Sequence, residues 1–307
     1  MNILITGGTG LIGRALILAL FKRDSVINIV VLSRSADKVK QLFGDSVKTI
    51  TCLSLAEIEQ QDIVINLAGE AIADKRWTKT QKETICQSRW QITEQLAQLI
   101  NSAQSPPGLF ISGSAIGIYG RQSSQPIDED FNDFHQEFSH EICAQWETLA
   151  LHAETDNTRV CLLRTGIVLD KKGGALGKML LPFKMGLGGY MASGEQVMSW
   201  IHIDDMCSAI IHIIENESLK GAINMVSPNP STNKVFSQTL SHTLSRPCLL
   251  NTPSFMLKLI FGEMAELFIY GQHVVPAKLI NTGFSFQFSD LDSALVDLIN
   301  KKTINEN

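Results

Sequence analysis

Short apolar runs alternate with amphipathic stretches along the first two thirds of the chain. Runs of apolar, often β-branched residues predict strands at residues 2–5, 26–32, 47–52, 62–66, 108–112, 159–164 and 222–226. Between them, apolar positions with helical spacing predict helices at residues 11–21, 78–102, 136–154 and 204–216. Strands that lack polar alternation are typical of a parallel sheet with helices on both faces. The pattern therefore predicts a doubly wound α/β fold.

The alternation breaks after residue 169. Residues 170–199 contain seven glycines and little strand pattern, and the chain beyond residue 227 alternates prolines with amphipathic segments. The helix at 204–216 and the strand at 222–226 return the chain to the sheet. We therefore predict a sheet domain of residues 1–169 and 201–226 and a smaller, discontinuous C-terminal lobe of residues 170–200 and 227–300. Residues 301–307 are expected to form a tail.

The first predicted strand leads directly into a glycine turn and then into a helix. Such a turn lets the backbone approach a pyrophosphate closely, and the helix N-terminus offers unpaired N–H groups to it. We predict that a dinucleotide binds here, at Gly7, Thr9, Gly10, Leu11, Ile12 and Gly13. The spacing of these glycines resembles that of the short-chain dehydrogenase/reductase superfamily, which implies a Rossmann sheet of the extended type.

The residues that follow the second strand favour one cofactor. An NAD-preferring site usually carries an acidic residue about twenty positions beyond the glycine turn, to bind the ribose 2′-hydroxyl. This chain has Ser33, Arg34 and Ser35 there. A guanidinium binds a phosphate with two parallel hydrogen bonds, and hydroxyls add further donors. The sequence therefore favours NADP(H) over NAD(H); the alternative is that Arg34 only solvates the end of the strand.

Small residues follow the fourth and fifth predicted strands. Leu67, Ala68, Gly69 and Glu70 are expected to lie beside the cofactor, because small residues let a ribose and a ring rest against the backbone; an ordinary turn is the alternative. Residues 112–120 follow the fifth strand and resemble the segment of extended dehydrogenases in which a serine lies beside the nicotinamide. That resemblance implies Ser114, with Ser112 as the alternative.

Those enzymes also use a tyrosine and a lysine four residues later on one helix. This chain has three tyrosines, and the residues four positions after them are Ser123, Gly194 and Val274. On the predicted helix 136–154, Cys143 and Glu147 have the required spacing, but the cation is replaced by a carboxylate. A carboxylate raises the pKa of a nearby thiol, so Cys143 is expected to be a poor acid–base group. The alternative is that Cys143 packs and Glu147 caps a polar group.

If the protein is an enzyme, its proton donor is expected among Ser114, Tyr119, Cys143 and Glu147. Arg164, at the end of the sixth strand, is assigned to the cofactor side of the site. Its guanidinium is expected to pair either with an acidic group of the substrate or with Glu147.

Ten segments together resemble one family over nearly the whole chain. They are residues 7–13, 66–70, 75–77, 88–89, 143–147, 164–169, 173–176, 182–183, 186–189 and 199–205. The chain is similar to the atypical extended short-chain dehydrogenases known as epimerase family proteins, sometimes labelled cell-division inhibitors. The resemblance includes a C-terminal module, residues 253–295, of unknown role. It implies NADP binding and nucleotide-sugar chemistry, whereas the missing tyrosine–lysine pair argues against ordinary epimerase chemistry.

Composition and charge argue against several classes of binding partner. The net charge of −5 without long runs of one sign argues against nucleic acid and membrane surfaces as partners. No membrane span or signal sequence is expected, and the six scattered cysteines are typical of reduced thiols in a cytoplasmic protein. The seven histidines have no spacing typical of metal ligands, so no metal site is expected. The sequence makes no prediction of oligomeric state.

Two functions remain open. The first is an NADP(H)-dependent oxidoreductase or epimerase-like enzyme that acts on a small polar or nucleotide-linked substrate. The second is a non-catalytic regulatory or redox-sensing protein that binds NADP(H), and it predicts an exposed apolar patch near the cofactor. For the first, the glycine-rich residues 173–200 are expected to form a mobile substrate-side loop. Lys184, Gln196, Trp200 and His202 are expected to face the pocket.

Overall fold

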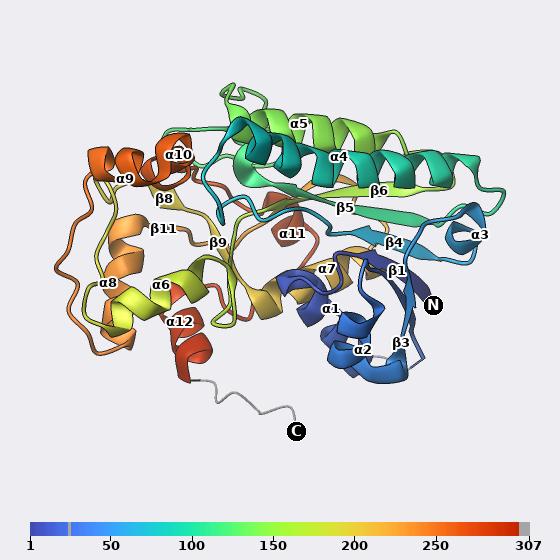
Figure 1. Cartoon of the computed structure of the whole chain (residues 1–307), viewed down its shortest axis with the longest axis horizontal. Coiled ribbons are helices and arrows are strands. Elements are labelled where there is room, and N and C mark those ends of the chain that lie inside the picture. Colours follow the sequence, from blue (N-terminus) through green and yellow to red (C-terminus); the bar gives the residue numbers. More distant parts are fainter. Residues whose placement is uncertain (24–25, 301–307) are drawn as a thin grey trace.

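A seven-stranded parallel sheet forms the centre of the computed structural model, which describes residues 1–23 and 26–300 (Figure 1). In spatial order the strands are β10 (Gly221–Met225), β6 (Arg159–Thr165), β5 (Leu109–Ala115), β4 (Ile63–Asn66), β1 (Asn2–Thr6), β2 (Asn28–Leu32) and β3 (Val47–Ile50). The order reverses between β1 and β4, as in a dinucleotide-binding sheet. The prediction of a doubly wound Rossmann fold is confirmed.

Helices cover both faces of the sheet. On one face lie α3 (Leu55–Ile58), α4 (Lys79–Ser102) and α5 (Phe138–Leu151), and on the other lie α1 (Leu11–Arg23), α2 (Ala36–Phe43), with the short η1 (Gly44–Ser46) after it, and α7 (Ile203–Glu215). Successive strand residues point to opposite faces. In β1, Ile3 and Ile5 pack toward α1 and α7, while Leu4 packs toward α4 and α5. Both faces of β1 are therefore apolar.

Beyond the carboxyl ends of the strands lies a second group of elements. It comprises β7 (Ile167–Leu169), α6 (Gly174–Lys184), β8 (Val197–Met198), β9 (Trp200–His202), β11 (Ser231–Thr232), α8 (Asn233–Thr243), α9 (Ser254–Phe261), η3 (Gly262–Ala265), α10 (Glu266–Ile269) and α12 (Leu291–Asn300). Helix α11 (Ala277–Asn281) packs instead beside the edge strand β10, where Lys278 Nζ donates to the Lys220 carbonyl at 3.0 Å. Strand β7 pairs in parallel with β9, and β8 pairs antiparallel with β11. The glycine-rich stretch thus contains an eleven-residue helix, α6, which the sequence pattern did not predict.

One hydrophobic core joins the lobe to the sheet. Phe183 of α6 and Phe236 of α8 belong to the same buried cluster as Ile5 of β1 and Ile210 of α7. The lobe therefore packs directly on one helical layer, and the proposed division at residues 170–200 and 227–300 stays a prediction. The predicted tail, residues 301–307, lies outside the described residues.

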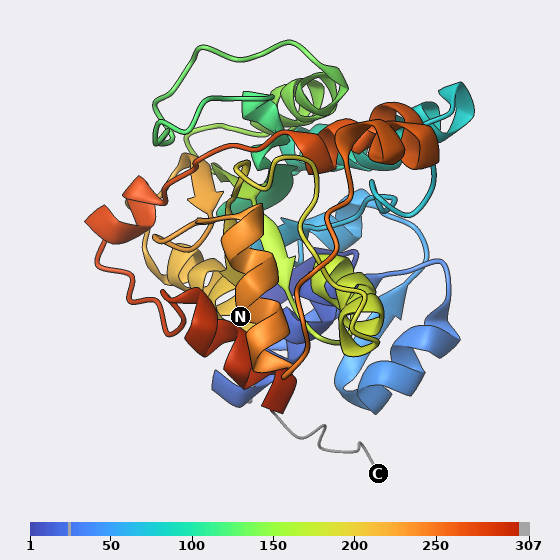
Figure 2. The ribbon, with the colours of Figure 1, turned by 90° about the vertical axis from the view of Figure 1, so that its left-hand side faces the viewer.

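The C-terminal module reaches back to the amino end of α4, as Figure 2 shows for α9 and α10. Lys82 of α4 forms an ion pair with Glu263, and Arg121 lies 3.4 Å from the Glu266 carboxylate. Arg121 follows the short helix η2 (Ile116–Tyr119), which continues β5. Among the described helices, none has the length and apolar composition that crossing a membrane requires.

Candidate functional site

The glycine turn after β1 holds α1 against the loop after β4. Gly7 has φ +69°, and a Cβ added there would lie 2.5 Å from the Leu67 carbonyl oxygen. The Gly10 amide donates to the Gly7 carbonyl at 2.9 Å, and a Cβ on Gly13 would overlap that same carbonyl. Only glycine permits these approaches. The turn therefore fits the backbone cradle that a dinucleotide pyrophosphate needs, with the half-buried Thr9, Leu11 and Ile12 around it.

A buried hydrogen-bond relay fixes the two loops of this cradle. The Thr6 hydroxyl donates to Asn66 Oδ1 at 2.6 Å, and Asn66 Nδ2 donates to the Thr93 hydroxyl at 2.8 Å. The Leu67 amide also donates to the Thr6 carbonyl at 3.1 Å. The relay joins β1, β4 and α4 at the edge where ligands bind in this fold. No pattern in the sequence indicates Thr93, because only the tertiary structure brings it beside Asn66.

The turn after β2 presents the residues expected to bind a 2′-phosphate. The Ser33 hydroxyl donates to the Ser35 carbonyl at 3.1 Å, and the Ser35 hydroxyl caps α2 by accepting from the Lys38 amide at 3.3 Å. Arg34 is exposed between them. The turn therefore places a cation beside the N-terminus of α2, whose dipole also favours an anion.

In the loop after β4, two of the residues predicted to lie beside the cofactor, Gly69 and Glu70, make contacts with other parts of the chain. The Glu70 amide donates to the Ser88 hydroxyl at 2.9 Å, and the Glu70 carboxylate lies 3.2 Å from Lys75 Nζ. Gly69 packs against Arg89 of α4, since a Cβ on Gly69 would lie 3.0 Å from Arg89 Cζ. Ala68 and Gly69 leave the small surface predicted for the cofactor. The carboxylate of Glu70, in contrast, is held by Lys75.

A buried ion pair occupies the position at which the resemblance to extended dehydrogenases implies a lysine. Arg164 binds Glu147 through two hydrogen bonds, Nε to Oε1 at 3.0 Å and Nη2 to Oε2 at 2.9 Å. The Ser114 hydroxyl donates to Glu147 Oε1 at 2.6 Å. Burial alone lowers the pKa of Arg164, but the Glu147 carboxylate outweighs it and raises that pKa. Arg164 pairs with Glu147 and is committed there, so its assignment to the cofactor is corrected.

Tyr119 is wrongly assigned as a proton donor. The side chain is fully buried, because η2 turns it inward from the end of β5. Its hydroxyl donates to Asn224 Oδ1 at 2.7 Å and accepts from Arg164 Nη1 at 3.0 Å. Burial raises the pKa of the phenol, although Arg164 opposes that rise. Tyr119 therefore helps to orient Arg164 through its hydroxyl and, being fully buried, does not face a ligand.

Cys143, on α5, lies beside Ser114 of β5 and is almost completely buried. Burial and then the Glu147 carboxylate raise the pKa of the Cys143 thiol to about 12. The expectation that Glu147 raises this pKa agrees with the structure, and at neutral pH the thiol is a poor acid and a poor nucleophile. Of the four donor candidates, Ser114 and Glu147 remain.

Two of the four substrate-side predictions are wrong. Trp200 and His202 lie in β9 with no exposed surface, because β9 pairs with β7 and both side chains enter the core. The Gln196 amide donates to the Met191 and Phe268 carbonyls, at 3.0 and 2.7 Å, which fixes its orientation within the lobe. Lys184 is exposed at the end of α6. The glycine-rich pattern gave no sign that β9 is a core strand.

His202 has a structural role. Its ring stacks on Phe288 with centroids 3.9 Å apart, and its Nδ1 caps α7 by accepting from the Asp204 amide at 3.0 Å. With Nδ1 as acceptor, the proton of the neutral ring sits on Nε2, which faces the Asp297 carboxylate at 3.4 Å. His202, Asp204 and Asp297 lie close enough together to hold a metal ion, and His202 Nδ1 already accepts the hydrogen bond of the Asp204 amide.

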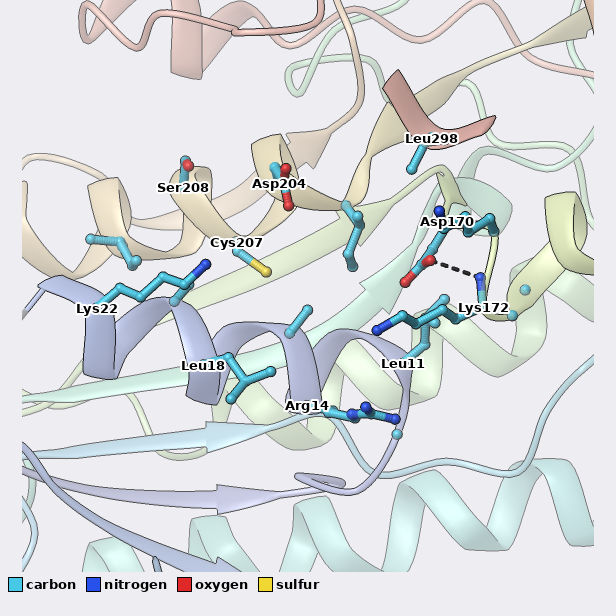
Figure 3. A pocket seen from close by; sticks show the side chains of 18 of the residues that line it. Leu11, Arg14, Leu18, Lys22, Asp170, Lys172, Asp204, Cys207, Ser208 and Leu298 are labelled. Carbon is cyan, nitrogen blue, oxygen red and sulfur yellow. Dashed lines mark hydrogen bonds between the residues drawn. The ribbon is translucent and has the colours of Figure 1, made fainter. Parts of the chain in front are cut away.

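A groove of about 860 Å³ runs along α1 from the glycine turn (Figure 3). Leu11, Leu18 and Cys207 give it an apolar floor between α1 and α7, and Lys22 lies at its far end. Near the turn, Gly173 approaches Leu11, since a Cβ on Gly173 would lie 3.2 Å from that side chain. The glycine-rich segment before α6 thus contacts the predicted cofactor turn directly.

The parallel sheet with this glycine turn defines a nucleotide-binding protein of the extended dehydrogenase type. The model of the NAD dependent epimerase/dehydratase family matches residues 3–225, and a domain of unknown function, DUF1731, matches residues 252–298. The chain belongs to the NAD dependent epimerase/dehydratase family.

Proteins similar to this chain carry the family name that the sequence resemblance implies, epimerase family protein. An epimerase family protein of Staphylococcus saprophyticus is 38% identical over 299 residues, 96% of this chain and 98% of that protein. The crystal structure of human epimerase family protein SDR39U1 with NADPH has a TM-score of 0.87 at 32% identity, over 98% of this chain and 99% of that one. UDP-glucuronic acid 4-epimerase from Bacillus cereus, with NAD, shares the fold at 18% identity and a TM-score of 0.77, over 98% and 97%. The predicted family is confirmed.

Proposed function

We propose that this protein is an NADP(H)-dependent oxidoreductase that acts on a small polar substrate. The observation that carries the proposal is the combination of the glycine cradle with the basic turn Ser33–Arg34–Ser35 after β2. Arg34 and the N-terminus of α2 would hold the 2′-phosphate, and the turn from Gly7 to Gly13 the pyrophosphate. The NADPH in the structure of human SDR39U1 is consistent with this preference.

The cofactor, when bound, supplies or accepts a hydride at its nicotinamide. The protein's part is to move the balancing proton. In the oxidative direction, Ser114 takes the proton of a substrate hydroxyl while its own proton passes to Glu147, to which it already donates at 2.6 Å. Arg164 orients that carboxylate with two hydrogen bonds. The reductive direction reverses these transfers.

Purified protein supplied with NADPH or NADP⁺ and panels of carbonyl and hydroxyl compounds tests this function. We expect that any turnover falls at least tenfold in Ser114→Ala and in Glu147→Gln and stays within about twofold in Cys143→Ala, since the Cys143 thiol is protonated at neutral pH. Sugar-nucleotide epimerase assays should show no turnover. Robust epimerisation of a UDP-sugar, or an activity that depends on Cys143 and not on Glu147, contradicts the proposal.

One observation favours a second function, a non-catalytic protein that reports NADP(H) to a partner. Helix α9, in the module of unknown function, exposes Phe255 at 69% and Leu259 at 76% of their surfaces. Exposed apolar side chains in a group are typical of interaction surfaces. Under this alternative, NADPH binds normally, no compound in the panels turns over, and Phe255→Ser changes partner binding without changing the affinity for NADPH.

A further inference from the structure

Arg89, on the inner side of α4, is a cation without a carboxylate partner at the candidate site. Its Nη1 donates to the Ile85 carbonyl at 2.9 Å, within its own helix. In residues 1–23 and 26–300 the structure records no other hydrogen bond and no ion pair for this guanidinium. The nearby Glu70 carboxylate is bound to Lys75 at 3.2 Å. Arg89 is therefore left with most of its five N–H donors unused.

The guanidinium is also held in a defined position. It lies over the ring of Trp146 at 5.2 Å from the centroid, so an aromatic face of α5 supports it. Two glycines make room for this stack. A Cβ on Gly69 would lie 3.0 Å from Arg89 Cζ, and a Cβ on Gly113 would lie 2.8 Å from the Trp146 ring. Because both glycines belong to the carboxyl ends of β4 and β5, the stack sits where ligands bind in this fold.

The surroundings of Arg89 make an unpaired charge costly. Burial lowers the pKa of its guanidinium, and the thiols of Cys143 and Cys86 and the carboxylate of Glu70 only partly oppose that shift. The positive charge of Arg89 in turn lowers the pKa of the Cys143 thiol, against the larger effects of burial and Glu147, and that thiol lies beside Ser114. Arg89 is half-buried, and a cation that is largely removed from water is normally paired with an anion. The missing anion is thus expected close to the residue that the proposed function assigns to proton transfer.

We propose that Arg89 binds a carboxylate of the substrate, and that the substrate class is a small organic acid. The planar guanidinium offers a carboxylate two parallel hydrogen bonds, and its position beside Gly69 and Cys143 places the acid group next to Ser114. This inference rests on the proposed function, because it takes the nicotinamide to lie beside Ser114.

Pyruvate and pyruvamide are matched probes, since they differ in a carboxylate against an uncharged amide. Each is titrated into the protein by calorimetry, with and without saturating NADPH. We expect pyruvate to bind at least tenfold more tightly than pyruvamide, about 1.4 kcal/mol. In Arg89→Gln the ratio should fall to about one, whereas Arg89→Lys should retain part of it as a point charge. Arg23→Gln, which removes an exposed arginine on α1, should leave the ratio unchanged.

The outcomes separate the two proposals. Equal affinity for both probes, or no binding of either, in a wild-type protein that binds NADPH overturns the role of Arg89 and leaves the cofactor assignment standing. A protein that does not bind NADPH contradicts the proposed function, and the titrations without NADPH then still test Arg89. Loss of NADPH affinity in Arg89→Gln, with pyruvate binding kept, would make Arg89 a cofactor residue and also overturns the inference. Circular dichroism of each variant checks that it folds.

Discussion

The Arg164–Glu147 pair is a buried polar contact whose disruption should strongly destabilise the fold. Both side chains are only about a tenth exposed, at 9% and 10%, and two hydrogen bonds of 3.0 and 2.9 Å join them. Glu147→Gln keeps the shape of the side chain and one acceptor for Ser114 but removes the charge. The Arg164 guanidinium then stays buried without a counter-charge. Breaking one partner of a buried pair in this way costs about 3–5 kcal/mol of unfolding free energy.

The matched control is the exposed pair of Arg23 and Glu215, whose side chains are 57% and 47% exposed. Glu215→Gln should cost less than about 1 kcal/mol, because water and salt screen a surface pair. Urea unfolding at pH 7, followed by circular dichroism, measures both values. The double variant Glu147→Gln with Arg164→Met should recover at least about 2 kcal/mol relative to the sum of the single variants. A cost below about 1 kcal/mol for Glu147→Gln, or strict additivity, refutes this account of the pair.

Three further predictions follow from burial and close packing. Burial raises the pKa of the Cys207 thiol to about 12, so the unfolded chain loses this proton at a lower pH than the folded protein does. The unfolding free energy should therefore fall above about pH 9, by about 1.4 kcal/mol per pH unit for this thiol. In urea unfolding at several pH values, Cys207→Ala should reduce that slope and Cys52→Ala, at an exposed cysteine, should not; equal slopes in the two variants would contradict this prediction. Gly13→Ala should weaken NADPH binding at least tenfold because its Cβ overlaps the Gly7 carbonyl, whereas Gly108→Ala, with open space around it, should leave the affinity unchanged. His202→Ala should lower the melting temperature and leave NADPH affinity unchanged, since His202 caps α7 inside the core; an unchanged melting temperature would show that the cap contributes nothing.

The fold follows from patterns that act over short distances. Apolar runs such as residues 62–66 and glycine turns such as Gly7 to Gly13 determine strands and the first helix locally, so the parallel sheet was predictable. Helix α6 does not follow from the sequence pattern because the glycines around it resemble a loop, whereas in the structure it packs into the core through Phe183. Tertiary packing outweighed local preference there.

The site was predictable only where one segment carries it. Cys143 and Glu147 share a helix, so the effect of the carboxylate on the thiol pKa follows from their spacing. The sequence does not determine the partner of Glu147, because Arg164 reaches it from a different element, strand β6. The same reason explains Trp200 and His202. Their sequence does not show that β9 pairs with β7 and that both side chains are buried in the core. Pairing between distant segments decides such residues.

Titration calorimetry with NADPH and NADH tests the central claim, which is that the turn after β2 selects a 2′-phosphate. We expect wild-type protein to bind NADPH at least tenfold more tightly than NADH, about 1.4 kcal/mol, and Arg34→Asp to remove that preference. Lys40→Asp, which reverses a charge further along α2, should keep most of it. Equal affinity of the wild-type protein for the two cofactors, or an undiminished preference in Arg34→Asp, would contradict the account.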